Sequence, residues 1–471
     1  MNEADGTTAD SAIEKSATQK RADDARTTQH SRSASPRTAK RKRRTSASAS
    51  ARPKPQRRLR LAIYSHDTFG LGHLRRNLLL SNAIEKWGPP TEIVLITGSP
   101  RAYFFDTPPH LEIVKLPSVT KDSNGAYVPR NFEIPLGDVL AMRKGMIRDA
   151  VIEHQPDALL VDHAPIGMCG ELLPLLSDLR HGTNGAPKDC QLILGLRDIL
   201  DDPQHVRNDW QRNGIYSVLE SLYHRLWVYG DRSVFDLGEL YGMSESVADR
   251  LSYLGYLGRI TNGTEGAQAS ASRDFADRSR PHVLCLVGGG GDGFPLAQSF
   301  VEMLERFPEQ WNGTLITGPF LPRPQRDELN RRVAELSNAR VLRFTARIEP
   351  LLHGSDVVIT MGGYNSMLEA HSLRKRVVVV PRVFPRREQW LRASSFEEHG
   401  LLRMVEPDKL SPAALAEATE KLLSCAAPPA PGDLGIAWDG MRVFARKMHE
   451  IARERIELGD SKHAGNKRLR A

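Results

Sequence analysis

Several features that would identify other kinds of protein are scarce in this chain of 471 residues. No stretch approaches the roughly 20 apolar residues of a membrane-spanning helix, and no apolar segment follows the N-terminal charges as in a secretory signal. No repeat of fixed short period is visible. The few cysteines are far apart and form no Cys-x-x-Cys pair, so we expect neither a structural zinc site nor a disulfide framework. They are Cys169, Cys190, Cys285 and Cys425.

The positive charge of the chain is concentrated at its N-terminus. The whole sequence has a net charge of +8, and residues 1–60 hold 16 Lys and Arg against 6 Asp and Glu, a net of +10. Residues 61–471 therefore sum to about −2 (8 − 10), which does not indicate a nucleic-acid-binding body. We expect no nucleic-acid partner.

Residues 1–58 form a basic tail that has almost no large apolar side chains and contains the run Lys40 to Arg44. Too little apolar area is available to offset the entropy cost of ordering it, so we expect disorder. Two interpretations of the tail stay open. It is a solvated leader, or a start assigned too far upstream, of a cytoplasmic protein, or it is attracted to anionic lipid headgroups at the inner face of the membrane.

From Leu59 onward, short apolar runs alternate with segments of helical periodicity, a pattern typical of βαβ units and parallel sheets. The first series predicts a helix over 73–87 and strands at 59–65, 92–97, 111–116, 158–162, 191–196 and 225–229. The second predicts a helix over 295–306 and strands at 282–287, 314–317, 341–344, 356–360 and 377–380.

These two series predict an α/β protein with two Rossmann-like domains and a cleft between the carboxyl ends of their sheets. The polar, Gly- and Ala-rich stretch 261–272 is the best linker candidate. We expect an N-terminal, acceptor-side domain over 59–262 and a nucleotide-binding domain over 263–433. A C-terminal helix and tail over 434–471 is expected to pack back on the N-terminal domain.

A glycine pair, Gly70 and Gly72, precedes the first helix, where backbone can approach a ligand closely. Arg75 stands where a dinucleotide fingerprint needs its third glycine, which disfavours NAD binding. His73 lies at the helix start, where the helix dipole would lower its pKa and keep the imidazole able to accept a proton. The alternative is that His73 only forms hydrogen bonds within the turn and takes no part in chemistry.

A second glycine-rich loop follows the strand at 282–287 and contains Gly289, Gly290 and Gly291. The spacing Gly288-x-Gly290-x-x-Gly293 matches a dinucleotide fingerprint. The next strand, however, ends in Thr317-Gly318-Pro319, without the acidic residue that would hold a ribose. We interpret the loop as a nest of backbone N–H groups for a phosphate or a reacting sugar.

The most specific segment runs from Asp356 to Ala370. Gly362 and Gly363 leave room for a diphosphate at the start of a helix whose free N–H groups point at it. Asn365 and Ser366 add side-chain donors. Glu369 lies four residues after Asn365 on the same helical face, where its carboxylate can accept both hydroxyls of a ribose.

This segment resembles part of the MurG-like glycosyltransferase family 28, which has the GT-B fold. The resemblance continues through the strand 377–380, which ends at Pro381, and the start of the helix at Gln389. The resemblance implies that Glu369 binds the donor ribose and that Gly362, Gly363 and Ser366 contact the diphosphate. Glu388 and Gln389 correspond to paired glutamines that hold donor-sugar hydroxyls, so one of the pair is changed. Further positions implied by the resemblance are Arg259 near the phosphates and the loop 346–352 with Ile348 at the uracil. The resemblance also implies an acceptor-side loop that contains Gly70, Gly72, His73 and Arg75.

The resemblance implies transfer of a sugar, N-acetylglucosamine or another hexose, from a UDP-sugar to an unidentified hydroxyl acceptor with inversion. His73 is the candidate base, with Asp162 or His163 as substitutes. No D-x-D motif is present, so we expect neither a metal nor a cofactor besides the UDP-sugar substrate. Alternatives are a UDP-sugar 2-epimerase, a nucleotide-sugar hydrolase and a non-catalytic nucleotide-sugar-binding protein. The sequence leaves the oligomeric state open.

Overall fold

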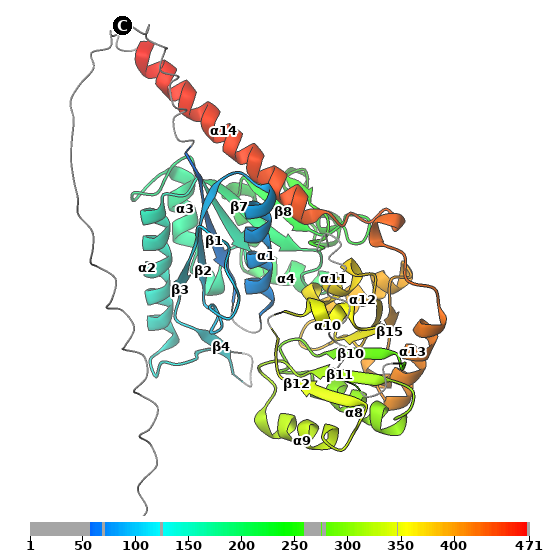
Figure 1. Ribbon diagram of the computed structural model, residues 1–471. Helices are drawn as coiled ribbons and strands as arrows, with labels where there is room; N and C mark the ends of the chain where they lie inside the picture. Colours follow the sequence, from blue (N-terminus) through cyan, green and yellow to red (C-terminus); the bar gives the residue numbers. More distant parts are fainter. Residues whose placement is uncertain are drawn as a thin grey trace, which may run out of the picture. The chain divides into compact units, whose positions relative to one another are not determined.

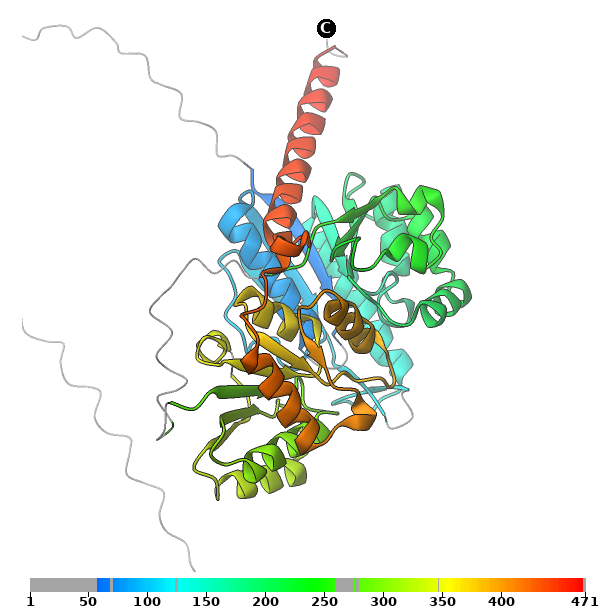
Figure 2. The same cartoon turned by 90° about the vertical axis from the view of Figure 1, so that its right-hand side faces the viewer.

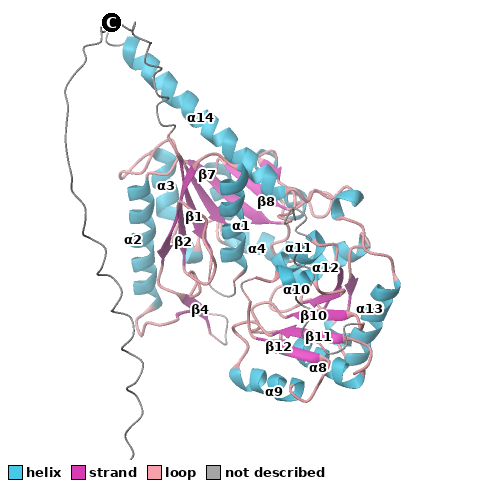
Figure 3. Cartoon of the chain, viewed as in Figure 1, coloured by secondary structure: helices cyan, strands magenta, loops and turns pink. Residues whose placement is uncertain are grey.

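The computed structural model describes residues 57–67, 71–122, 126–258, 275, 279–345 and 347–468. From Arg57 onward the chain forms one compact unit with two parallel sheets, each covered by helices (Figures 1 and 3). The predicted α/β class with two Rossmann-like domains is confirmed. The basic tail up to residue 56 and the linker candidate 261–272 lie outside the described residues.

The N-terminal sheet has seven parallel strands. In order across the sheet they are β3 (Leu111–Lys115), β2 (Thr91–Thr97), β1 (Leu59–Ser65), β6 (Ala158–Asp162), β7 (Gln191–Arg197), β8 (Arg225–Tyr229) and β9 (Leu251–Tyr253). Successive residues of β1 face opposite sides of the sheet, so that Leu61 and Ile63 join one apolar core and Ala62 and Tyr64 join another.

Helices cover both faces of this sheet. Helix α1 (Gly72–Trp87) packs on the face of Leu61 and Ile63, and α2 (Leu136–His154) and α3 (Leu173–His181) pack on the other. Smaller elements complete the domain: α4 (Pro203–Arg212), α5 (Ile215–Ser221), α6 (Leu237–Leu240), α7 (Glu245–Ala248), and an antiparallel hairpin of β4 (Val119–Lys121) and β5 (Tyr127–Pro129).

The C-terminal sheet has six parallel strands, in the order β12 (Ala339–Leu342), β11 (Asn312–Ile316), β10 (His282–Leu286), β13 (Val357–Thr360), β14 (Arg376–Val379) and β15 (Arg403–Met404). Its helices are α8 (Phe294–Arg306), α9 (Arg323–Val333), α10 (Glu349–His353), α11 (Tyr364–Ser372), α12 (Glu388–Glu398) and α13 (Pro412–Ser424). The N-termini of α8, α11 and α12 follow the loops at the carboxyl ends of strands, which is where α/β sheets bind ligands.

The apolar runs predicted that two strands begin later in the sequence than they do in the structure. Strand β11 begins at Asn312, and β12 begins at Ala339 and continues through Arg340, so both start two residues before the predicted positions. Their first residues are polar or small, and a search for apolar runs passes over them. The hairpin β4–β5 was not predicted, because strands of three residues are too short to show an alternating pattern.

The last helix, α14 (Gly440–Arg468), packs on α1 of the N-terminal domain, as both views show (Figures 1 and 2). Phe444 is buried and meets Trp227 edge to face, with ring centroids 5.5 Å apart. Farther along, Arg455 donates to Asp157 at 2.7 Å. Although α14 has 29 residues, neither it nor any other helix in the described ranges is apolar enough over its length to cross a membrane.

The two domains are joined at their carboxyl edges by a buried ion pair. Arg392 of α12 donates two hydrogen bonds of 2.7 Å to the carboxylate of Asp198, which follows β7, and a third of 3.2 Å to the carbonyl of Gly362. The hydroxyl of Tyr364, at the start of α11, donates to the carbonyl of Tyr229 at 2.8 Å. These contacts connect the glycine turn before α11 to the edge of the opposite sheet.

Replacing Asp198 by Ala should lower the free energy of unfolding by about 3–5 kcal/mol, because the Arg392 guanidinium would stay buried without its counter-ion. Urea denaturation measures this change. The free energy of unfolding of the double variant Asp198→Leu with Arg392→Leu should be closer to that of the wild type, since both charges are removed. A single variant as stable as the wild type would show that the pair does not hold the domains together.

Candidate active site

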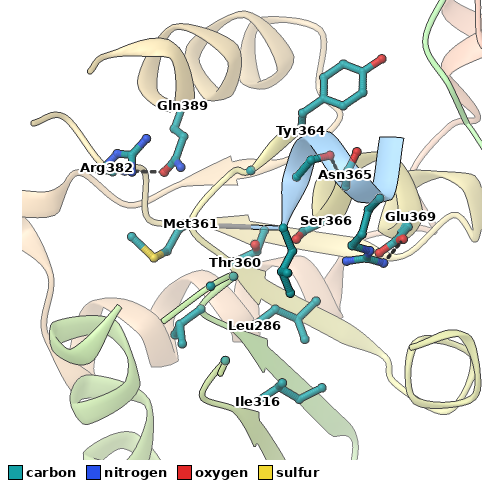
Figure 4. Close-up of a pocket in the computed structure, with 18 of the residues that line it drawn as sticks. Leu286, Ile316, Thr360, Met361, Tyr364, Asn365, Ser366, Glu369, Arg382 and Gln389 are labelled. Carbon is teal, nitrogen blue, oxygen red and sulfur yellow. Dashed lines mark hydrogen bonds and ion pairs between the residues drawn. The ribbon is translucent and has the colours of Figure 1, made fainter. Parts of the chain in front are cut away.

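A cavity of about 280 Å³ lies between the two domains at the carboxyl ends of their sheets. Leu286 and Ile316 from the ends of β10 and β11, and the first turns of α11, form part of its wall (Figure 4). The predicted site residues that line it are Gly72, His73, Arg75, Gly289, Gly291, Ile348, Gly363, Asn365, Ser366, Glu369, Glu388 and Gln389.

The N-terminal domain contributes a histidine held by a carboxylate. His73 Nδ1 lies 2.7 Å from Oδ2 of Asp162, and Arg76 donates two hydrogen bonds of 2.6 and 3.0 Å to Oδ1 of the same carboxylate. Arg76 Nη2 also lies 2.9 Å from His73 Nδ1. Because an ionised carboxylate only accepts, Nδ1–H donates to Asp162, and the lone pair of Nε2 is free to take a proton. A guanidinium only donates, so the contact between Arg76 Nη2 and this protonated nitrogen is not a hydrogen bond.

The protonation states agree with this arrangement. Burial lowers the pKa of His73 more than the nearby Asp162 raises it. For Asp162, burial alone would raise the pKa, but Arg76 and His73 lower it to about 2. At neutral pH the pair is therefore a neutral imidazole beside a carboxylate. The direction of the His73 shift is the predicted one, but its main cause is burial and not the helix dipole.

Two further histidines surround His73. The ring centroid of His163 lies 5.1 Å from that of His73, and that of His66 lies 5.9 Å away. Burial lowers the pKa of both side chains, to about 3 for His66 and well below its usual range for His163. His163 has a φ of 70°, a left-handed conformation that is uncommon for a residue other than glycine. The two histidine rings next to His73 are thus neutral at neutral pH and add no charge beside it.

The glycine loop after β10 packs backbone against backbone. Gly290 has a φ of 89°, and a Cβ there would lie 2.1 Å from the carbonyl oxygen of Thr317. Gly318 has a φ of 76°, and its Cβ would lie 2.5 Å from the backbone of Gly289. No other residue fits at Gly290 and Gly318, and the resulting turn brings Gly289 and Gly291 to the cavity wall.

The N-terminus of α11 opens into the same cavity. Gly362 has a φ of 78°. Gly363 is the N-cap residue; it has no side chain to cap the helix, and the space next to its Cα is open. The first-turn N–H groups of the helix are therefore available to an anion, and the first turn contains no acidic residue. Asn365 Nδ2 donates to the carbonyl of Gly72 across the cleft at 3.0 Å.

Glu369, the predicted ribose ligand, is paired with an arginine of the other domain. Its side chain is 5% exposed, and its Oε1 accepts from Nη2 of Arg75, which the sequence had placed in the acceptor-side loop (Figure 4). Arg75 therefore reaches across the cleft from α1 to α11. In this state a guanidinium occupies the acceptor atom that a ribose hydroxyl would need.

Glu388 and Gln389 begin α12 on the other side of the cavity. Gln389 Oε1 accepts from the backbone N–H of Arg382 at 3.0 Å, which leaves its amide NH₂ free of that contact. Glu388 is buried, and its Oε1 accepts from Arg382 Nη2 at 2.8 Å, while Oε2 has no partner. Burial favours the neutral acid, but Arg197 and Arg382 outweigh it and lower the pKa of Glu388, so the carboxylate is charged.

Not every predicted residue lies on the cavity wall. Asp162 and His163 act behind or beside His73, Gly362 accepts from Arg392, and Gly290 packs under the loop. Gly70 and Arg259 lie outside the described residues. The roles of Arg76 and Arg392 were missed, although Arg76 stands three positions after His73 and Arg392 four after Glu388, spacings that place each pair on one helical face.

Comparison with known proteins identifies the C-terminal half. Residues 284–431 match the family "Glycosyltransferase family 28 C-terminal domain". An uncharacterized glycosyltransferase of Methanosarcina mazei is 32% identical over 126 residues, 27% of this chain and 31% of that protein. A UDP-N-acetylglucosamine–N-acetylmuramyl-(pentapeptide) pyrophosphoryl-undecaprenol N-acetylglucosamine transferase of Streptococcus pyogenes is 27% identical over 170 residues, 34% of this chain and 44% of that protein. The chain thus spans less than half the length of these relatives.

Solved structures resemble both domains together. The glycotransferase of kitacinnamycin aligns with a TM-score of 0.51 and 17% identity over 86% of this chain and 99% of its own. The UDP-GlcNAc 2-epimerase of Methanocaldococcus jannaschii aligns with a TM-score of 0.52 and 12% identity over 83% of this chain and 99% of its own. At such identities the likeness shows the fold alone. The chain has the GT-B fold, and its residues 284–431 match the C-terminal domain of glycosyltransferase family 28.

Proposed function

We propose that the protein is a glycosyltransferase that moves a sugar from a UDP-sugar to a hydroxyl acceptor with inversion, and that it needs no metal. One observation carries the proposal. The neutral His73, locked by Asp162, and the uncapped N-terminus of α11, which bears Glu369, line the same cavity. A proton acceptor and an anion-binding helix end therefore face one another across a space at which both domains meet.

The donor would be held mainly by the C-terminal domain. Its diphosphate fits the helix start at Gly363 and the turn at Gly289 and Gly291, where backbone N–H groups offer hydrogen bonds without a bound cation. The ribose fits Glu369, once Arg75 releases its carboxylate. Ile348, a buried residue at the start of α10, lines the wall where the base would pack.

The reaction then proceeds as a single displacement. The acceptor hydroxyl gives its proton to Nε2 of His73 while its oxygen bonds to the anomeric carbon of the sugar. The bond between that carbon and the β-phosphate oxygen breaks, and UDP leaves with the electron pair. Asp162 stabilises the imidazolium that forms, and the N-terminus of α11 stabilises the charge that develops on the diphosphate.

An epimerase or hydrolase of the same fold is the second candidate, since the aligned 2-epimerase shares the architecture. The His73–Asp162 pair favours the transferase, because a base set to deprotonate a hydroxyl is what an acceptor needs. Incubation with UDP-N-acetylglucosamine in the absence of an acceptor separates the two, since an epimerase or a hydrolase would consume it.

Replacing His73 by Ala should abolish sugar transfer while donor binding persists. UDP-sugars should raise the melting temperature of wild type and variant alike, whereas turnover should fall on the order of 10²- to 10⁴-fold, the usual contribution of a general base. Thermal shifts with UDP-, GDP- and dTDP-sugars and UDP release with a panel of acceptors measure the two effects. The matched variant His205→Ala, on the exposed side of α4, should behave as wild type. Full activity of His73→Ala would contradict the assignment.

The pH dependence follows from the lowered pKa of His73. A base must be deprotonated, so kcat/KM should hold as the pH falls through 6.5 and decline only below that value. Asp162→Asn removes the carboxylate that raises this pKa and fixes the tautomer, so the acid limb should shift lower still. Its rate should drop on the order of 10³- to 10⁴-fold, as when a histidine loses its orienting carboxylate. An acid limb above pH 7 would be inconsistent with His73 as the base.

A further inference from the structure

One arginine on the wall of this cavity forms no ion pair with any described residue. Five arginines form part of its wall. Four of them have carboxylate partners: Arg75 with Glu369, Arg76 with Asp162, Arg382 with Glu388 and Asp292, and Arg392 with Asp198. The fifth is Arg197, at the end of β7. Within the described part of the chain no carboxylate forms an ion pair with it, and its buried Nε has no hydrogen-bond partner.

An unpaired cation in this position costs stability. Taking a guanidinium out of water is expensive unless a counter-charge and hydrogen bonds replace its hydration. Burial lowers the pKa of Arg197 to about 10, which expresses the same cost. Glu388 is the carboxylate that acts on it most, but that group is already paired with Arg382. The site therefore offers Arg197 no negative charge of its own in an ion pair.

The place of Arg197 in the cavity indicates where that charge would be. The sugar of a bound donor must lie between the diphosphate site at Gly363 and the base His73. Arg197 and Glu388 line the same cavity as Gly363 and His73, one from each domain. Glu388 Oε2 is a buried acceptor without a partner, and Arg197 Nε is a buried donor without one. A sugar that carries both a hydroxyl and an anionic group would satisfy both atoms.

We propose that Arg197 makes the sugar subsite selective for an acidic donor sugar, a hexuronic acid whose carboxylate pairs with the guanidinium while a ring hydroxyl donates to Glu388. This inference rests on the proposed function. A planar guanidinium matches a carboxylate with two parallel hydrogen bonds, which a neutral sugar cannot offer. The diphosphate is a less suitable partner for Arg197, because backbone N–H groups of the opposite domain already face its site.

The binding of UDP, UDP-glucose, UDP-glucuronic acid and UDP-galacturonic acid, measured by calorimetry, tests the inference. The wild type should bind at least one UDP-hexuronate about tenfold to a hundredfold more tightly than UDP-glucose. Arg197→Gln should remove this preference and leave the affinities for UDP and UDP-glucose within about twofold. Arg197→Lys should keep part of this preference, because a lysine has the positive charge but not the two parallel N–H donors of a guanidinium. The control Arg323→Gln, on the exposed surface of α9, should match the wild type.

Each other outcome has a distinct meaning. If Arg197→Gln weakens UDP as much as the UDP-hexuronates, Arg197 holds the diphosphate and the inference is wrong. Equal affinity of the wild type for UDP-glucose and both hexuronates would also overturn it, while the proposed function would stand. If UDP itself does not bind, the proposed function fails first.

A stability measurement separates a ligand-binding role from a structural one. Because Arg197→Gln removes an unpaired cation, its melting temperature without ligand should equal or exceed that of the wild type. A UDP-hexuronate should stabilise the wild type more than the variant. A variant that melts well below the wild type would mean that Arg197 supports the fold, and the inference would be rejected.

Discussion

The buried pair of Arg392 and Asp198 fixes the two domains of this protein edge to edge. Asp198 directly follows β7, Arg392 lies in the second turn of α12, and Arg392 also donates to the carbonyl of Gly362. The turn before α11, which presents free N–H groups to the cavity, is thereby tied to the opposite domain. The N-terminus of α11 and His73, which come from different domains, line one cavity next to this contact.

Other carboxylates of the cleft are also paired with arginines. Asp162 is satisfied by Arg76 and His73, so that one ionised carboxylate both anchors a helix and fixes a tautomer. Glu369 accepts from Arg75 of the opposite domain, and under the proposed function a ribose would take the place of this arginine. Each of these two acidic groups thus has an arginine partner. Arg197, which has no such partner, is where this pattern calls for a ligand.

The sequence predicted most of the fold, because buried parallel strands are continuous apolar runs and their glycine turns are conspicuous. It also pointed to Glu369, since spacing along one helix places the glutamate on the face of Asn365. Contacts between the domains, such as Arg75 with Glu369 and Arg392 with Asp198, were not predicted. They join residues far apart in the chain, and local periodicity contains no information about which strand end meets which helix start.

The central claim is that Glu369 recognises the ribose of a uridine nucleotide in this cleft. Calorimetric binding of UDP and 2′-deoxy-UDP to the wild type and to Glu369→Ala tests it most directly. A hydrogen bond to a carboxylate predicts that the wild type binds UDP roughly tenfold or more tightly than 2′-deoxy-UDP, and that the variant binds the two alike. Equal affinity of the wild type for both nucleotides would contradict the account.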